Sequence, residues 1–472
     1  MAKKAYFIGL AGKTMAPLAK AFKDWGWEVS GSDQEKIYPP VTDYLKKNKI
    51  LCQKGYRPDN LSFVPDLIVV GRSALIVDSQ NPEYLKAKTL GCPVLSYPEV
   101  LQKYLLKKNS VVVAGTYGKT TLTALIAWIL LKAGLNPSYM IGGVPLNMAD
   151  GVKITDSSWS VVEGDETPAL WENDPPKFMY YQPKFLLLTA TKWDHPEIFK
   201  TAKDYQQAFV NLARLLPADG LLVYNWENVE KEIVQTAAGR KISYSFDNQQ
   251  ADWLVKDFSF LPEKTVFKIQ GKGKELQLKT ILLGKHNLEN ICGAVALALE
   301  IGIEEKAILS AVQTFKGVKT RLEFLGKFGG RYLFWDFAQH PEKVKGSLEA
   351  LRERFPSQKI ISVFDPSMTG LKYSESLDWY QEAFAKANQV IVSKVSFIKK
   401  VGKENRVSGK DIVSAIAKTQ PQVFYEPLDE RIIKWLLEKT KQDDIIVFMS
   451  SGGLRFTRLI EDTINELKEP KN

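Results

Sequence analysis

Short apolar runs alternate with longer stretches in which apolar residues recur every three or four positions, and this alternation repeats along the whole chain. The short runs are typical of buried strands, and the longer spacing is typical of amphipathic helices. The pattern therefore predicts an α/β fold of parallel sheets with crossover helices. Strands are predicted over residues 5–9, 27–30, 66–70, 93–96, 110–114, 158–163, 185–188, 220–224, 332–335, 359–363, 389–392 and 444–449.

The alternation falls into three blocks, which we interpret as three domains. A polar segment, residues 107–109, separates the first block from the second, and the third begins near Gly317. Helices are predicted over residues 15–25, 120–133, 287–301, 304–315 and 341–354, and a hairpin over residues 253–279. The predicted domains are residues 1–108, 109–316 and 317–472.

Composition places the chain among soluble globular proteins. It has 472 residues, of which 45% are apolar and 25% charged, as is ordinary for such proteins. The longest purely apolar run, residues 124–131, is far shorter than the roughly 18–20 residues that span a bilayer, so no membrane span is expected. Three widely separated cysteines exclude a zinc ribbon or a disulfide scaffold and fit a reducing compartment. We therefore expect a cytoplasmic protein, with residues 5–9 a buried first strand and not a secretion signal.

The net charge of +10 comes from basic residues scattered along the chain. Such a balance suits nucleic acid or a substrate that carries several phosphates. Because no zinc finger or RNP-type aromatic run is present, nucleic acid is not expected as a partner. A phosphorylated substrate is the better match.

The sharpest local signal is residues 111–121, where a β-branched strand is followed by a glycine turn and a helix start. This arrangement directs backbone N–H groups and the positive helix end at a polyphosphate. Gly115 and Gly118 would shape the loop, Lys119 would reach the β/γ oxygens, and Thr120 would offer a hydroxyl to Mg²⁺. A common P-loop has a further glycine where this chain has Val113, so the loop is shorter. The segment predicts ATP binding, against the alternative of a plain strand–helix turn with an exposed lysine.

The three histidines of the chain, His195, His286 and His340, all follow predicted strands or begin predicted helices. Ligands bind at such places in α/β sheets. Glu166 also follows a predicted strand, so it could converge with His195 and Thr120 on the phosphates. Carboxylate and hydroxyl oxygens with one imidazole suit Mg²⁺ or Mn²⁺ better than zinc. The alternative is that the acidic residues here favour a helix N-terminus through its dipole.

Several of these segments, taken in order, resemble the Mur ligase family, the ATP-dependent amide-forming enzymes of peptidoglycan assembly. The resemblance covers nearly the whole chain. It implies a Rossmann-like N-terminal domain that binds a UDP-sugar, a central P-loop ATPase domain and a Rossmann-like C-terminal domain that binds the acceptor. The segments are residues 9–12, 31–33, 115–121, 163–166, 194–195, 284–290, 321–323 and 336–341.

The resemblance also implies the reaction: the γ-phosphoryl group of ATP activates the lactyl carboxylate of UDP-N-acetylmuramate, and an amine then forms the amide. Residues 31–40, 141–145 and 449–453 favour a peptide acceptor, as in peptidoglycan recycling. Residues 81–83 look more like the family members that take L-alanine, so that alternative stays open. None of these patterns predicts an oligomeric state.

The family's functional residues map onto matching positions. Lys119, Glu166 and His195 would be catalytic, with His340 near the incoming amine. The metal, Mg²⁺ or Mn²⁺, would be held by Thr120, Glu166 and His195. Uridine diphosphate would contact Gly9, Gly12, Ser32 and Asp33. The nucleotide would be bound by Gly115, Thr116, Gly118, Lys119, Thr120, Thr121, His286, Asn287, Asn290, Arg321 and Asp336.

Some positions depart from the family pattern. Ala190 stands where the family usually has Asn, Lys192 where an acidic residue is frequent, Trp335 where Asp is common, and Gln339 where His is. An arginine pair is reduced to Thr320-Arg321, and residues 365–371 lack an expected arginine. These departures motivate a rival reading, a nucleotide-binding protein that has lost its chemistry. A small-molecule kinase is a further rival, but it leaves the first and third blocks unexplained.

Overall fold

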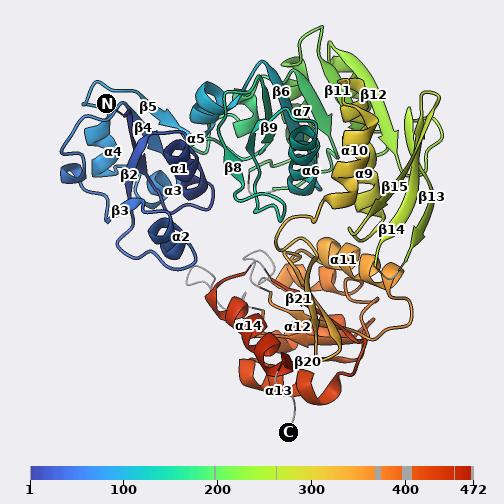
Figure 1. Cartoon of the computed structure of the whole chain (residues 1–472). Helices are drawn as coiled ribbons and strands as arrows, with labels where there is room; N and C mark the ends of the chain where they lie inside the picture. The colour runs from blue at the N-terminus through green and yellow to red at the C-terminus, as the bar shows by residue number, and fades with distance from the viewer. Residues whose placement is uncertain are drawn as a thin grey trace. The chain divides into compact units, whose positions relative to one another are not determined.

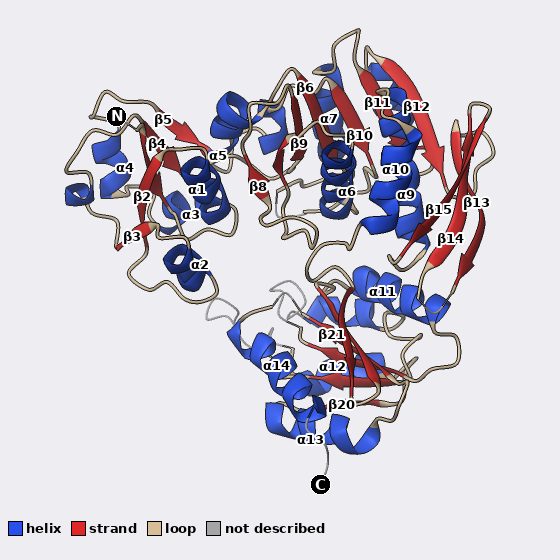
Figure 2. Cartoon of the chain, in the orientation of Figure 1, coloured by secondary structure: helices blue, strands red, loops and turns tan. Residues whose placement is uncertain are grey.

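The computed structural model describes residues 2–195, 198–261, 263–366, 374–395, 407–450 and 452–468. The chain divides into two compact units (Figure 1). The first comprises Met1–Phe258, Val266–Thr280 and His286–Lys316, and the second comprises Ser259–Thr265, Ile281–Lys285 and Gly317–Asn472. Each unit contains a sheet of mainly parallel strands with helices between them, which confirms the predicted α/β fold class (Figure 2). Among the described residues, none of the helices combines the length and apolar character that a bilayer crossing requires.

The N-terminal part of the first unit is a five-stranded parallel sheet in the order β3-β2-β1-β4-β5. Its central strands are apolar and buried, as expected for a sheet covered on both faces. The carboxyl ends of β1 and β2 lie side by side at one edge of the sheet, because Ile8 pairs with Ser32. The elements are β1 (Lys4–Ile8), α1 (Met15–Asp24), β2 (Glu28–Asp33), α2 (Val41–Lys47), β3 (Leu51–Lys54), η1 (Pro58–Asn60), β4 (Leu67–Val70), α3 (Arg72–Val77), α4 (Pro82–Ala87), β5 (Val94–Ser96), α5 (Tyr97–Val100) and the π-helical η2 (Leu101–Leu105).

The central sheet has ten strands in the order β15-β14-β13-β12-β11-β10-β6-β9-β7-β8. Strand β6 lies in its interior, with Val113 opposite Glu163 on β9 and Ala114 opposite Leu188 on β10. Helix α6, which follows β6, is apolar on all sides and packs against β9 and α10. The elements are β6 (Asn109–Ala114), α6 (Lys119–Lys132), β7 (Ser138–Met140), β8 (Val152–Lys153), β9 (Trp159–Glu163), η3 (Lys177–Tyr180), β10 (Phe185–Leu188), α7 (Ala202–Arg214), β11 (Leu221–Asn225), α8 (Lys231–Thr236), β12 (Arg240–Ser245), β13 (Trp253–Phe260), β14 (Thr265–Gly271), β15 (Lys274–Thr280), α9 (Lys285–Glu300) and α10 (Glu305–Thr314).

The second unit contains a six-stranded sheet in the order β16-β17-β21-β18-β19-β20. The edge strand β16 runs antiparallel to β17, and the remaining pairs are parallel. The elements are β16 (Glu323–Phe328), β17 (Arg331–Asp336), α11 (Pro341–Arg354), β18 (Ile360–Phe364), η5 (Ser374–Tyr380), β19 (Gln389–Val392), α12 (Gly409–Ile416), β20 (Val423–Tyr425), α13 (Asp429–Lys439), β21 (Ile445–Met449) and α14 (Leu454–Lys468).

Most predicted strands are present within a few residues, but the prediction was wrong at the edges and ends. Strands β3, β7, β8, β12, β16 and β20 were not predicted. Four of them, β3, β8, β16 and β20, are edge strands of two to six residues, each paired on one side only. Asn109, predicted as part of a polar linker, begins β6. Each sheet lies inside one predicted domain, and the boundaries at residues 108 and 316 stay predictions.

Candidate active site

The phosphate loop, residues 115–118, joins the end of β6 to the start of α6. Gly115 and Gly118 have φ angles of +133° and +76°, which L side chains rarely adopt. A Cβ on Gly115 would lie 2.2 Å from Thr189 Oγ1, and a Cβ on Gly118 would lie 2.7 Å from Asn290 Oδ1. Conformation favours glycine at both positions, and at Gly115 the backbone of Ala190, 2.8 Å from the added Cβ, leaves no space for a side chain. Because α6 begins at Lys119, the free N–H groups of its first turn lie next to the loop.

Lys119 and Glu166 form an ion pair at the start of this helix. The Lys119 ammonium lies 3.0 Å from each carboxylate oxygen of Glu166, and it donates to the Gly115 carbonyl at 2.5 Å. The side chains are 15% and 3% exposed, so solvent screens the pair weakly. In this state the Glu166 carboxylate neutralises the loop lysine, and an incoming phosphate would compete for the same cation.

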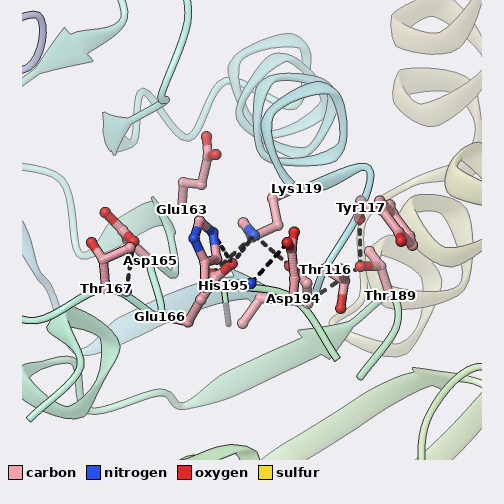
Figure 3. A network of polar contacts seen from close by, with 12 residues as sticks. Thr116, Tyr117, Lys119, Glu163, Asp165, Glu166, Thr167, Thr189, Asp194 and His195 are labelled. Carbon is pink, nitrogen blue, oxygen red and sulfur yellow. Dashed lines mark hydrogen bonds and ion pairs between the residues drawn. The ribbon is translucent and has the colours of Figure 1, made fainter. Parts of the chain in front are cut away.

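His195 approaches the same carboxylate from the segment that follows β10. Its Nε2 atom lies 3.6 Å from Glu166 Oε1. The residue has a φ of +57°, an uncommon backbone conformation outside glycine, and its N–H donates to Asp194 Oδ1 at 2.8 Å. Figure 3 shows Lys119 and His195 converging on Glu166. The predicted meeting of Glu166 and His195 is therefore observed.

Thr120, the third predicted metal ligand, has a different carboxylate as its partner. Its hydroxyl donates to Glu163 Oε1 at 2.8 Å, and the Gly142 N–H donates to Glu163 Oε2 at 2.7 Å. Glu163 was not among the predicted site residues, although it is the last residue of the buried strand β9. That position, an acidic residue ending an apolar strand, is the signal that could have singled it out.

The oxygen and nitrogen donors at this edge suit a hard divalent cation. No group of three or more His, Cys, Asp or Glu side chains in the described part of the chain is arranged as a complete metal cage. Mg²⁺ is usually held by one or two carboxylates together with substrate phosphates and water, so an incomplete protein cage is what this ion requires. Thr120, Glu166 and His195 remain the predicted ligands.

Backbone carbonyls anchor the phosphate loop to the residues that follow β10. The Thr116 N–H donates to the Ala190 carbonyl at 2.9 Å, and the Thr116 hydroxyl donates to the Lys192 carbonyl at 2.6 Å. The Thr189 hydroxyl donates to the Tyr117 carbonyl at 2.6 Å. Ala190 and Lys192 depart from the family pattern, but the bonds they make here use main-chain oxygens. These two substitutions therefore leave the anchoring of the loop intact.

The predicted nucleotide residues of α9 lie at its N-terminal end. Asn290 lies beside Gly118, and Asn287 is 8% exposed. His286 is exposed in the first turn, and Thr121 is half-buried in the first turn of α6. The structure brings Asn290 to the phosphate loop, and the adenine contacts of the α9 residues stay a prediction.

At the N-terminal sheet, the residues predicted to bind uridine diphosphate lie together after β1 and β2. Gly9 has a φ of +84°, and a Cβ there would lie 3.4 Å from Ala74 Cβ. The Ser32 carbonyl accepts from the Gly9 and Leu10 N–H groups at 3.0 and 2.9 Å, and Asp33 Oδ2 accepts from Ala11 N at 2.6 Å. The side chain of Ser32 is fully buried. Ser32 and Asp33 thus hold the backbone of residues 9–12, which includes Gly12.

Arg321, Asp336 and His340 belong to the second unit. The Arg321 guanidinium lies 5.1 Å from the centre of the Phe337 ring. Asp336 is buried and accepts from Leu322 N at 2.9 Å and from the Ser347 hydroxyl, and burial raises the pKa of its carboxyl group. The nucleotide contacts of Arg321 and Asp336 stay predictions.

His340 caps helix α11 through a contact of 3.4 Å between its Nδ1 and the Glu342 N–H, and its ring centre lies 5.7 Å from that of Trp379. Trp335 Nε1 is buried and has no hydrogen-bond partner among the residues that the structure describes, and Gln339 is 3% exposed. Part of the expected arginine loop, residues 367–371, and Ser451 of the segment 449–453 lie outside the described residues. The proximity of His340 to the acceptor amine stays a prediction.

A glycine loop at a helix start, with a lysine and a buried carboxylate beside it, is typical of P-loop nucleotide-binding proteins of the α/β class. Family models match in three consecutive segments: "Mur ligase family, catalytic domain" over residues 4–109, "Mur ligase middle domain" over 113–298 and "Mur ligase, glutamate ligase domain" over 320–452. The chain belongs to the Mur ligase family, whose members are ATP-dependent ligases that form amide bonds.

Relatives of two acceptor types resemble the chain equally well. A UDP-N-acetylmuramate–L-alanine ligase of Nostoc is 28% identical, with 98% of this chain and 97% of the relative covered. The UDP-N-acetylmuramate–L-alanyl-γ-D-glutamyl-meso-2,6-diaminoheptandioate ligase of Escherichia coli is 29% identical, with 95% of each chain covered. The crystal structure of UDP-N-acetylmuramate-alanine ligase from Thermotoga maritima has a TM-score of 0.78 at 22% identity and covers 98% of this chain and 99% of its own, which supports the fold.

Proposed function

We propose that the chain is an ATP-dependent ligase that joins the amine of a peptide to the lactyl carboxylate of UDP-N-acetylmuramate. The observation that carries the proposal is the phosphate loop whose lysine is held 3.0 Å from Glu166, with His195 beside the same carboxylate. Such a site binds and orients the γ-phosphate of ATP. Because the chain belongs to a family of amide-forming ligases, the expected product of the reaction is an amide.

A carboxylate does not condense with an amine in water, because hydroxide is a poor leaving group. In the proposed first step a lactyl carboxylate oxygen attacks the γ-phosphorus of ATP, the bond between that phosphorus and the β–γ bridging oxygen breaks, and ADP leaves. The amine then attacks the carbonyl carbon of the acyl phosphate. The carbon–oxygen bond to phosphate breaks, inorganic phosphate departs, and the amine nitrogen loses a proton.

In the first step two anions, the carboxylate and the γ-phosphate, must approach each other. The residues of the site reduce the repulsion between them. Lys119 exchanges its Glu166 partner for the γ-phosphate and neutralises the charge that spreads over the transferring group. The first-turn N–H groups of α6 hold the neighbouring phosphate oxygens. Thr120, Glu166 and His195 would hold Mg²⁺, which adds positive charge to the phosphates when bound.

A peptide acceptor is favoured by the segments in residues 31–40 and 141–145, and by the Escherichia coli relative, whose name gives a peptide as acceptor. L-Alanine is the second candidate, because residues 81–83 and the Nostoc relative favour it. The two candidates share the activation of the same carboxylate and differ only in the amine.

A measurement of ADP release distinguishes the two acceptors from each other. It also distinguishes a ligase from a nucleotide-binding protein that has lost its chemistry. The purified chain is mixed with ATP, Mg²⁺ and UDP-N-acetylmuramate, and the tripeptide L-alanyl-γ-D-glutamyl-diaminopimelate or L-alanine is added. We expect turnover with the tripeptide and little with L-alanine. The reverse preference assigns the second candidate. ATP binding without ADP release under either condition contradicts the proposal.

A further inference from the structure

Glu83, in the first turn of α4, is a buried carboxylate that the ligase chemistry does not use. It has no solvent exposure, and two hydroxyl groups donate to it. The Tyr6 hydroxyl on β1 lies 2.6 Å from Oε1, and the Ser32 hydroxyl on β2 lies 2.7 Å from Oε2. The two donors are 77 and 51 residues distant in sequence, so Glu83 connects the middle of β1 and the carboxyl end of β2 to one helix.

Burying this carboxylate is unfavourable. Burial raises the pKa of Glu83, although hydrogen bonds from Tyr6, Ser32, the Asn60 side chain and the Arg57 backbone oppose that rise. Replacing the carboxylate by an apolar side chain would leave the buried Ser32 and Tyr6 hydroxyls without this acceptor, which is unfavourable. The carboxylate therefore supplies two strong acceptors at fixed positions.

The bond from Ser32 links Glu83 to the glycine loop that follows β1. A serine hydroxyl has one proton, which Ser32 donates to Glu83. The Ser32 side chain has no exposed surface, so in this structure it does not present its hydroxyl to a ligand. Its carbonyl oxygen instead accepts from the N–H groups of Gly9 and Leu10, at 3.0 and 2.9 Å. Ser32 is thus fixed at both ends, by Glu83 at its side chain and by residues 9–12 at its backbone.

We propose that Glu83 is a positioning residue for nucleotide-sugar binding, which acts through Ser32 to fix the loop of residues 9–12 at the end of β2. The inference rests on the proposed function, in which this loop contacts the UDP group of UDP-N-acetylmuramate. It reassigns Ser32 from a direct contact to a link between Glu83 and the loop.

The variant Glu83→Gln tests the link without changing the size of the side chain. In the amide one of the two acceptor oxygens is replaced by an NH₂ group, which donates, so the two hydroxyls can no longer each donate to their own oxygen as they do in the carboxylate. We expect the KM for UDP-N-acetylmuramate to rise about 10-fold, which corresponds to the loss of one charge-assisted hydrogen bond. The KM for ATP and the kcat should stay within about 2-fold, because the phosphate loop is untouched.

Two further variants separate positioning from a structural role. Tyr6→Phe removes the other hydroxyl on the same carboxylate and leaves Ser32 in place, so it should lower the Tm and change the UDP-sugar KM less than about 2-fold. Ser32→Ala should raise that KM by about the same factor as Glu83→Gln. In the double variant Glu83→Gln with Ser32→Ala, the effects should not multiply, because both changes break one link. If Glu83→Gln fails to fold, the comparison of Ser32→Ala with Tyr6→Phe decides the question alone.

Two measurements test the positioning role of Glu83 separately from the proposed ligase activity. UDP-N-acetylmuramate binding is measured by calorimetry without ATP, alongside ADP release. If the wild-type chain releases ADP and Glu83→Gln binds the UDP-sugar normally, the positioning role is refuted and the ligase proposal stands. Equal KM rises in Tyr6→Phe and Ser32→Ala also refute it, because the cluster then acts only through stability. A wild-type chain that binds UDP-N-acetylmuramate but does not turn over refutes the ligase proposal instead.

Discussion

The ion pair between Lys119 and Glu166 makes the substitution Lys119→Met the most informative change in the active site. Methionine keeps the length of the apolar stem but removes the charge that lies 3.0 Å from both Glu166 oxygens. If this ammonium neutralises the transferring phosphoryl group, its loss should lower kcat by at least about 10²-fold, as the loss of one preorganised donor does. In free-energy terms this is about 2.7 kcal/mol at the transition state.

The same substitution also affects stability, because it leaves Glu166 3% exposed and without its lysine partner. Removing one partner of a fully buried pair costs about 3–5 kcal/mol, and we expect less here since Lys119 is 15% exposed. Lys177→Met is a matched control. Lys177 is 17% exposed and lies 2.6 Å from Asp165, in the same unit but with no predicted contact to ATP.

The assay is ADP release under saturating ATP and UDP-N-acetylmuramate, with the thermal midpoint of each variant measured beside it. Both variants should unfold at lower temperature than the wild type, but only Lys119→Met should lose turnover. An activity of Lys119→Met within about 3-fold of the wild type would refute a role of the loop lysine in phosphoryl transfer. Equal losses of activity in the two variants would attribute the effect to stability.

Three further outcomes follow from the site. His195→Ala should raise the Mg²⁺ or Mn²⁺ concentration needed for half activity, and an unchanged metal titration would make His195 structural. Gly118→Ala should weaken ATP binding at least about 10-fold in a calorimetric titration, because its Cβ would lie 2.7 Å from Asn290 Oδ1 at a φ of +76°; unaltered affinity would contradict the loop geometry. Burial acts to raise the pKa of Asp165, but Lys177 and the hydrogen bonds from Thr167 together more than offset it, so the pKa lies below its ordinary value. This pair stabilises the fold above the unfolded pKa of about 3.9 and loses its contribution as the pH falls through the lower folded pKa. The Tm difference between wild type and Lys177→Met should therefore be larger at pH 6 than at pH 3, and a difference that grows toward acid would overturn this sign.

Elements whose apolar residues are buried could be predicted from the sequence closely. Strand β10 and helix α11 have the predicted bounds, because the spacing of their apolar residues reflects the burial that stabilises them. Strand β8 spans two residues at a sheet edge and has no such signal, since backbone pairing alone defines it. The phosphate loop was predictable because its two glycines, which adopt positive φ angles, and its lysine lie within one short segment of the sequence.

Partners that meet through tertiary packing could not be predicted in the same way. The partner of Thr120 is Glu163, which depends on the register between β6 and β9 and not on any local motif. The hydrogen bond from the Ser32 hydroxyl to Glu83 links residues that are 51 positions apart. It joins a strand to a helix whose pattern in the sequence is weak. Likewise, Ala190 contacts the phosphate loop through its carbonyl oxygen, which every residue type possesses, so the identity of this residue could not predict the contact.

The proposed reaction passes through an acyl phosphate, and transfer of labelled oxygen from the carboxylate to phosphate detects this intermediate. UDP-N-acetylmuramate carrying ¹⁸O in both lactyl carboxylate oxygens is incubated with the chain, ATP, Mg²⁺ and the accepted amine, and the inorganic phosphate is analysed by mass spectrometry. Activation by phosphoryl transfer predicts one ¹⁸O atom in each phosphate released with amide product. Amide formation with unlabelled phosphate would contradict the account.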